Sequence, residues 1–186
     1  MGINPVKRIT LDGVLIALFL ALGFLRIRVG TFLEIGFGTL VIVLAAVLLS
    51  PIDVLIIAGV GELLNQLFFS PYGITPTLPL WVLPVVVRGA IISLVAYLYR
   101  RKGDNLMKHK VIYFVTVLGA ALVISCLDTG LLYLDGIIMN YPVSYTLLQT
   151  GMRFLTSQIT GIVVSILVIF IYKSVYILFP NVKERE

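Results

Sequence analysis

The chain has 186 residues, of which 60% are hydrophobic and 12% are charged, and its formal net charge is +5. Its mean hydropathy is +1.09. So few polar side chains cannot cover a water-soluble domain of this length, and they leave no room for a separate soluble catalytic domain. We therefore expect one integral membrane domain over residues 1–186.

Apolar runs divide the chain into six predicted helices. Crossing about 30 Å of hydrocarbon takes about 20 helical residues. The sequence predicts an all-α membrane bundle with helices at residues 11–25, 34–49, 52–69, 78–99, 111–134 and 152–179. The first two runs are short, and Ser50-Pro51 separates the second from the third, because proline ends one helix and can open the next. Six crossings place both termini on the same side of the membrane.

The basic residues orient this bundle. Ten of the 14 Lys and Arg residues fall on the side of the termini: Lys7, Arg8, Arg100, Arg101, Lys102, Lys108, Lys110, Lys173, Lys183 and Arg185. The positive-inside rule therefore predicts a multi-pass protein of the cell membrane with both termini in the cytoplasm. The basic start followed by an apolar run also imitates a signal peptide. Asp12 fits the inner end of a membrane helix, so we expect the segment to be retained.

The first predicted helix carries a stripe of small residues. Gly13, Ala17 and Ala21 stand at every fourth position and therefore share one helix face. Small residues let two helix backbones approach closely, which is the usual way helices associate in lipid. Two interpretations stay open: the stripe docks onto another membrane subunit, or it packs inside the chain's own bundle.

Polar side chains within the third and fourth helices mark the first candidate site. Glu62, Asn65 and Gln66 share one face of the third helix, and Arg88 lies within the fourth. Such residues are costly in lipid and are candidates for function by default. One hypothesis is a structural pair between Glu62 and Arg88. The other is that Arg88 presents its planar guanidinium to a carboxylate or phosphate of a ligand.

More polar and aromatic groups are predicted to converge on the outer half of the bundle. Asp128 lies toward the outer end of the fifth helix, a loop over residues 135–151 is expected to follow, and Arg153 opens the sixth helix. The proline-rich connection after the third helix holds Tyr72 and leads to Trp81. These aromatics also suit an interfacial belt. Their proximity to two arginines favours a substrate pocket. Arg26 and Arg28, in the first outer loop, are interpreted either as rim charges that attract an anion or as snorkelling side chains.

Several chemistries find no support in the sequence. No G-x-x-x-x-G-K-[ST] phosphate loop is present, so ATP hydrolysis is not expected from this chain. One histidine, His109, and one cysteine, Cys126, lie at different depths and offer neither a zinc site nor a nucleophile pair. We expect no enzyme activity, no metal, no cofactor and no nucleic-acid partner.

In size, helix number and small-residue spacing, the chain resembles the substrate-binding S component of an energy-coupling factor (ECF) vitamin transporter. Residues Glu34-Ile-Gly-Phe-Gly-Thr-Leu40 and the turn at Ser50-Pro51 are similar to the opening of the folate and pantothenate branches. The folate branch carries a Phe-Pro-Gly-Phe-Thr stretch where this chain reads Tyr72-Gly-Ile-Thr-Pro-Thr77, which argues against folate.

The resemblance implies a mechanism and a set of partners. S components capture a vitamin from outside and reorient in the membrane while docked on a transmembrane coupling subunit that two ATPase subunits drive. Gly13, Ala17 and Ala21 are then the docking face. A vitamin acid such as pantothenate, with Arg88 holding its carboxylate, is the favoured substrate. Folate and a ring of the pyridoxine or pyrimidine type are the alternatives.

Two hypotheses of other classes stay open. A self-sufficient channel or proton-coupled carrier would use Glu62 and Asp128 as protonation sites. An assembly subunit would bind no ligand at all. Under the vitamin hypothesis, the substrate-contacting residues are Glu62, Asn65, Gln66, Tyr72, Trp81, Arg88, Asp128 and Arg153.

Overall fold

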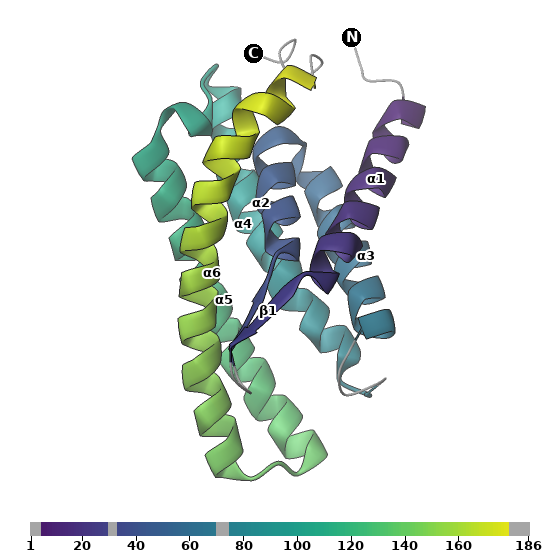
Figure 1. Ribbon diagram of the computed structural model, residues 1–186, viewed down its shortest axis with the longest axis vertical. Coiled ribbons are helices and arrows are strands. Elements are labelled where there is room, and N and C mark those ends of the chain that lie inside the picture. The colour runs from purple at the N-terminus through teal and green to yellow at the C-terminus, as the bar shows by residue number, and fades with distance from the viewer. Residues whose placement is uncertain (1–4, 30–32, 70–74, 179–186) are drawn as a thin grey trace.

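The structure, a computed structural model, describes residues 5–29, 33–69 and 75–178 (Figure 1). Within these ranges, six α-helices confirm the predicted helical bundle: α1 (Pro5–Phe24), α2 (Gly38–Leu48), α3 (Pro51–Phe69), α4 (Val82–Arg101), α5 (Lys110–Met139) and α6 (Val143–Leu178). Two short strands, β1 (Arg26–Val29) and β2 (Leu33–Gly36), lie between α1 and α2. Two 3₁₀ helices, η1 (Leu78–Trp81) and η2 (Leu106–Lys108), precede α4 and α5.

The six helices do not all have membrane-spanning length. In the part of the chain that the structure describes, four segments are long and apolar enough: Pro51–Phe69, Leu78–Arg101, Lys110–Met139 and Val143–Ser174. The predicted six crossings are therefore not supported. Helix α2 has only 11 residues, or about 16 Å. Helix α1 carries Lys7, Arg8 and Asp12 in its first half, and these charges shorten its apolar run.

The two ends of the helical chain lie together. Helix α1 begins and α6 ends at the same end of the bundle (Figure 1). The turn between α4 and α5 also lies at this end, whereas the turn between α5 and α6 lies at the other. Which membrane face the first end occupies stays a prediction from the positive-inside rule.

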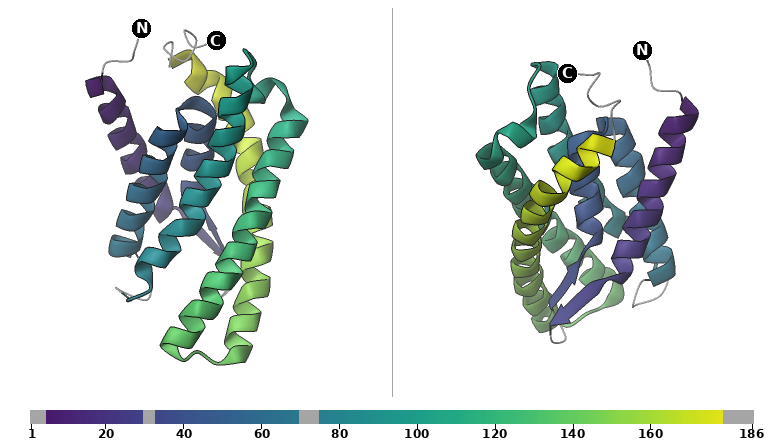
Figure 2. Two further views of the ribbon diagram at one scale, coloured as in Figure 1. Left: turned by 180° about the vertical axis from the view of Figure 1, so that it is seen from behind. Right: turned by 45° about the horizontal axis from the view of Figure 1, so that its top comes forward.

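The region predicted as an outer loop and as the start of the second helix is a β-hairpin. Strands β1 and β2 pair antiparallel, with Arg28 opposite Glu34 and Arg26 opposite Gly36. The expected helix start at residue 34 is wrong because the segment alternates polar and apolar residues with period two, as strands do. Strand β2 lies against α6, and Figure 2 shows the hairpin crossing the bundle toward that helix.

The loop predicted over residues 135–151 is also wrong. Helix α5 continues to Met139 and α6 begins at Val143, so only a three-residue turn separates them. Asn140 takes a left-handed conformation (φ 54°), and the following amide, of Tyr141, donates to the carbonyl of Gly136 at 2.9 Å, closing the helix end. The two helices pack against each other, and Asp135, Thr146 and Gln149 are buried where the sequence suggested a solvated loop. The joined ends of α5 and α6 extend beyond the other helices (Figure 2).

Helix α2 is the core of the bundle. Every residue from Leu40 to Leu48 is buried, as is Gly38, because α1, α4 and α6 all pack against this helix. An element enclosed by protein does not need to span the lipid. Arg100 of α4 donates to the carbonyls of Leu48 and Leu49 and so satisfies carbonyl groups that have no partner within α2.

The predicted break at Ser50-Pro51 is confirmed and begins α3. The Ser50 hydroxyl accepts from the amide of Asp53 at 3.5 Å and donates to its carboxylate at 2.6 Å. This is the arrangement of a serine N-cap with proline at the first helical position. Arg8 of α1 forms an ion pair with the same carboxylate, which fastens the start of α1 to the start of α3.

Phe19 fixes the other half of α1 to the bundle. Its side chain is 4% exposed and lies against two glycines. A Cβ atom at Gly61 would come within 2.9 Å of the ring, and one at Gly38 within 3.1 Å. Glycine at these positions lets the ring enter between α2 and α3, so that α1 packs by one face only.

Truncating the centre of α2 should destabilise the whole bundle. Ile42 is 0% exposed, so Ile42→Ala leaves a cavity that rigid neighbours cannot fill, at a cost of about 2–5 kcal/mol in the free energy of unfolding. Ile162 on α6 is 44% exposed, and Ile162→Ala should cost about 1 kcal/mol or less. Denaturant unfolding of both variants in the same detergent measures the difference, and equal losses would contradict a core centred on α2.

Candidate functional site

Arg88 is the centre of the polar region inside the bundle. It lies within the span Leu78–Arg101, and its guanidinium donates to the Thr39 hydroxyl of α2 at 2.9 Å and to the Ser157 hydroxyl of α6 at 3.5 Å. Among the described residues its direct hydrogen-bond partners are thus neutral hydroxyls. A guanidinium has five N–H donors, so two such bonds leave donors available for a ligand.

Acidic residues surround Arg88 at longer range. Asp128 of α5 and Glu62 of α3 both act on it electrostatically. Asp128 is also within electrostatic range of Arg153 of α6. We call these four residues the charged cluster. The fold therefore brings together four residues that the sequence analysis selected from four different helices.

The predicted polar face of α3 forms a hydrogen-bonded group. Glu62 is 6% exposed and accepts from Gln66 Nε2 at 2.7 Å and from Asn65 Nδ2 at 3.2 Å. The side-chain amide of Asn65 packs against Gly23, near the C-terminal end of α1. A Cβ atom added to Gly23 would lie only 3.2 Å from Asn65 Oδ1. Two amide donors stabilise the carboxylate in a low-dielectric setting.

Trp81 meets the charged cluster through Arg153. The guanidinium carbon of Arg153 lies 4.4 Å from the centre of the indole ring, a distance typical of a cation–π contact. The same 3₁₀ segment is tied to α5, because Thr77 donates to the buried Asp135 carboxylate at 2.7 Å. Side chains of α5 and α6 thus hold residues 77–81 over one side of the bundle. Tyr72, also predicted to contact the substrate, lies outside the described residues.

Thr39, Ser157 and Asp135 were missed by the sequence analysis. Ser157 stands four residues after Arg153 and therefore on the same face of α6, a signal that could have identified it. Thr39 stands at the start of a buried apolar run, where a hydroxyl is uncommon. Asp135 was placed in a loop, and its partner, Thr77, is 58 residues away.

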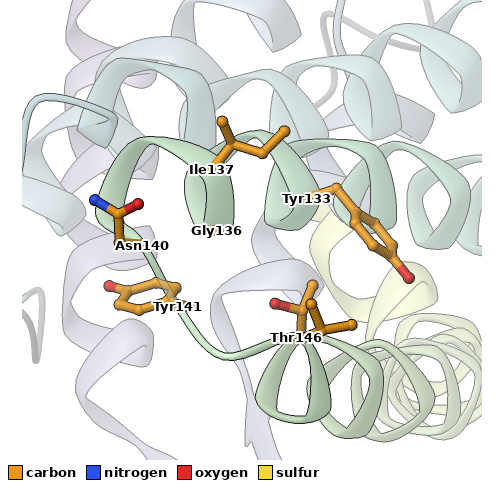
Figure 3. A pocket seen from close by; sticks show the side chains of 7 residues that line it. Tyr133, Gly136, Ile137, Asn140, Tyr141 and Thr146 are labelled. Atoms are coloured by element: carbon orange, nitrogen blue, oxygen red, sulfur yellow. The ribbon is translucent and has the colours of Figure 1, made fainter.

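A separate pocket opens where α5 ends and α6 begins (Figure 3). Its volume is about 370 Å³. It is lined by aromatic, aliphatic and polar side chains of the two helix ends: Tyr133, Gly136, Ile137, Asn140, Tyr141, Val143 and Thr146. None of the charged cluster lines this pocket. The pocket lies beside the turn between α5 and α6, at the end of the bundle opposite the connection between α4 and α5 (Figure 1). It places two tyrosines and an amide at that end.

The small-residue stripe of α1 faces outward. Gly13, Ala17 and Ala21 are all exposed, and a Cβ atom added to Gly13 would meet no atom within 4 Å. The opposite face of α1, with Phe19, contacts the bundle. Of the two interpretations of the stripe, packing inside the chain's own bundle is therefore wrong, and the outward face is open to another helix.

Comparison with known proteins gives the class and then the family. The architecture is that of a solved S component: the structure described as "Structure and mechanism of the S component of a bacterial ECF transporter" superposes with a TM-score of 0.64, covering 94% of this chain and 98% of that one at 21% identity. A family model described as "ECF-type riboflavin transporter, S component" matches residues 4–174. The chain therefore belongs to this family of membrane transporter subunits. Comparison with curated proteins finds no match.

The contact between Arg153 and Trp81 can be measured directly, since Trp81 is the only tryptophan of the chain. Arg153→Gln removes the guanidinium from the ring face, so acrylamide should quench the indole fluorescence more strongly than in the unmodified chain. Arg101→Gln, which removes an exposed arginine at the end of α4, is the matched control and should leave quenching unchanged. The same quenching constant in all three proteins would contradict the contact.

Proposed function

We propose that this chain captures a vitamin with high affinity for an ATP-driven ECF importer and that riboflavin is the vitamin. The family description over residues 4–174 supports riboflavin. The observation that carries the capture function is the charged cluster with Trp81 beside it, inside helices that are otherwise apolar. Ionisable groups in such positions are costly and usually serve a ligand or a transport step.

The side chains offer what a flavin needs. Riboflavin has a flat ring system with polar edges and a chain of hydroxyl groups, and it carries no net charge near neutral pH. Trp81 offers an aromatic ring, and the guanidinium carbon of Arg153 lies 4.4 Å from its centre. Hydroxyl groups can be held by carboxylate and amide side chains such as Glu62 and Gln66, which share a bond of 2.7 Å.

A second candidate, pantothenate, is favoured by Arg88. Its direct partners in the described residues are the Thr39 and Ser157 hydroxyls, and neither neutralises a guanidinium. A carboxylate would supply that charge and form a bidentate pair. Folate and a pyridoxine-type ring remain further alternatives. A proton-coupled carrier using Glu62 and Asp128 is the rival of another class, and it would need no ATPase.

The proposed partners follow from the same assignment. The 186 residues contain no phosphate-binding loop for ATP, so two ATPase subunits acting through a transmembrane coupling subunit would supply the energy. We assign docking to the outward stripe Gly13, Ala17 and Ala21. Close approach of a partner helix there would give van der Waals packing, which is the main source of helix association in lipid.

Titration of vitamins into the purified chain tests the capture function and separates the two substrates. Riboflavin should bind with nanomolar affinity, which corresponds to about −12 kcal/mol. Arg88→Gln should weaken a carboxylate ligand by about 1.5–3 kcal/mol, or roughly 10- to 150-fold, and riboflavin by less than about tenfold. The measurement is isothermal titration in detergent with riboflavin, pantothenate, folate and pyridoxine.

The exposed Arg101 provides the matched control for this titration, because Arg101→Gln removes the same charge outside the cluster. It should bind each vitamin as the unmodified chain does. If the chain binds only pantothenate, and Arg88→Gln abolishes that binding, then pantothenate and not riboflavin is the substrate. A folded chain that binds none of the four vitamins would refute vitamin capture by this panel and favour the carrier.

Enlarging the stripe on α1 tests the docking surface. Ala17→Trp puts a bulky ring where a partner helix is expected to approach, so uptake and co-purification of the coupling subunit should be lost while vitamin binding is kept. Leu94→Trp on α4, where Leu94 is 54% exposed, is the control and should retain uptake. Normal uptake by Ala17→Trp would place the docking surface elsewhere.

A further inference from the structure

The connection between α4 and α5 concentrates positive charge at one end of the bundle. Residues 100–110 contain six basic side chains, counting His109, and a single acid, Asp104. Arg100 turns inward to the carbonyls that end α2. The remaining cations are exposed: Arg101, Lys102, Lys108, His109 and Lys110. We call this segment, residues 101–110, the basic turn.

The backbone of the basic turn is held in a defined shape. Gly103 takes a positive φ of 72°, and its amide donates to the carbonyl of Arg100 at 3.0 Å, while the amide of Asp104 donates to that of Tyr99 at 3.1 Å. These bonds end α4 in the manner of a glycine-terminated helix. Asn105 then caps η2, accepting from the amide of Met107 at 3.0 Å.

Two contacts anchor the basic turn to the bundle. Leu106 is 1% exposed and belongs to the hydrophobic core. Asn105 Nδ2 donates to the hydroxyl of Tyr172 on α6 at 2.7 Å. The cations therefore project from a fixed platform, and less conformational entropy is lost when they bind a ligand than from a loose loop.

The one acid in the basic turn is already engaged. His109 Nε2 lies 2.7 Å from Asp104 Oδ2, and Lys108 Nζ lies 3.8 Å from Oδ1. The hydrogen bond from His109 is the main reason that the pKa of the Asp104 carboxyl lies below its usual value. Arg101, Lys102 and Lys110 form no ion pair with any residue that the structure describes, so their charge is available.

The position of the basic turn in the membrane indicates which kind of ligand its cations bind. The spanning segment Leu78–Arg101 ends, and Lys110–Met139 begins, at the two ends of this turn. Its cations therefore lie at the level of the lipid headgroups. Each basic residue near an anionic bilayer surface contributes about a fivefold gain in affinity. We propose that the basic turn binds the phosphate groups of anionic phospholipids.

Lipid binding to the full chain tests this proposal. Native mass spectrometry in a neutral detergent measures bound phosphatidylglycerol and, separately, phosphatidylcholine. The unmodified chain should retain phosphatidylglycerol preferentially, and the double variant K102Q/K110Q, which removes two of the cations without an ion pair, should lose about tenfold or more in affinity for it. The double variant K7Q/K173Q removes two exposed cations from other segments at the same end of the bundle, and it should lose clearly less affinity than the first variant because these two side chains do not belong to the fixed basic turn.

Further measurements distinguish lipid from other ligands of the basic turn. Millimolar inorganic phosphate should not displace the lipid, and both variants should unfold in denaturant as the unmodified chain does, which shows that they are folded. Equal retention of the two lipids, or equal losses in the two double variants, overturns the proposal. Displacement by inorganic phosphate also overturns it. A K102Q/K110Q variant that keeps phosphatidylglycerol but no longer binds the coupling subunit overturns it as well, since the basic turn would then face a protein.

Discussion

An arginine placed inside an apolar helix must find its partners within the protein, and the architecture of this bundle depends on how Arg88 does so. Hydroxyls reach it from α2 and α6, and carboxylates act on it from α5 and α3. Hydrogen bonds with α2 and α6 and the longer-range charges of α5 and α3 thus act on one side chain of α4. A buried charge without such surroundings would cost several kcal/mol. The two hydroxyls accept hydrogen bonds from the guanidinium but do not neutralise its charge. Such neutral partners suit a site in which a ligand replaces them as the acceptor.

The short helix α2 makes this meeting possible. Because α1, α4 and α6 enclose it, it ends where the core ends instead of crossing the lipid. It brings Thr39 to Arg88 at its start and is closed by Arg100 at its end. The same enclosure uses only one face of α1, the face of Phe19, and leaves the small-residue face outside. A buried core helix and an open docking face are thus two results of one packing arrangement.

The two ends of the molecule differ in chemistry. The end with the α5–α6 turn carries the pocket with Tyr133 and Tyr141, and the opposite end carries the basic turn (Figure 1). A rigid basic turn held in anionic headgroups would resist the tilting that the reorientation mechanism requires. Lipid composition would then influence transport as well as anchoring.

The sequence by itself determined the helical membrane bundle, the break at Ser50-Pro51 and the polar positions inside apolar helices, because each depends on neighbours a few residues away. Only the tertiary structure decided that residues 26–29 and 33–36 pair as strands and that α5 and α6 extend to Met139 and from Val143. It also decided the partners of Arg88, which lie 49 and 69 residues away. Local periodicity shows that a face is small or polar, but only packing decides what that face meets.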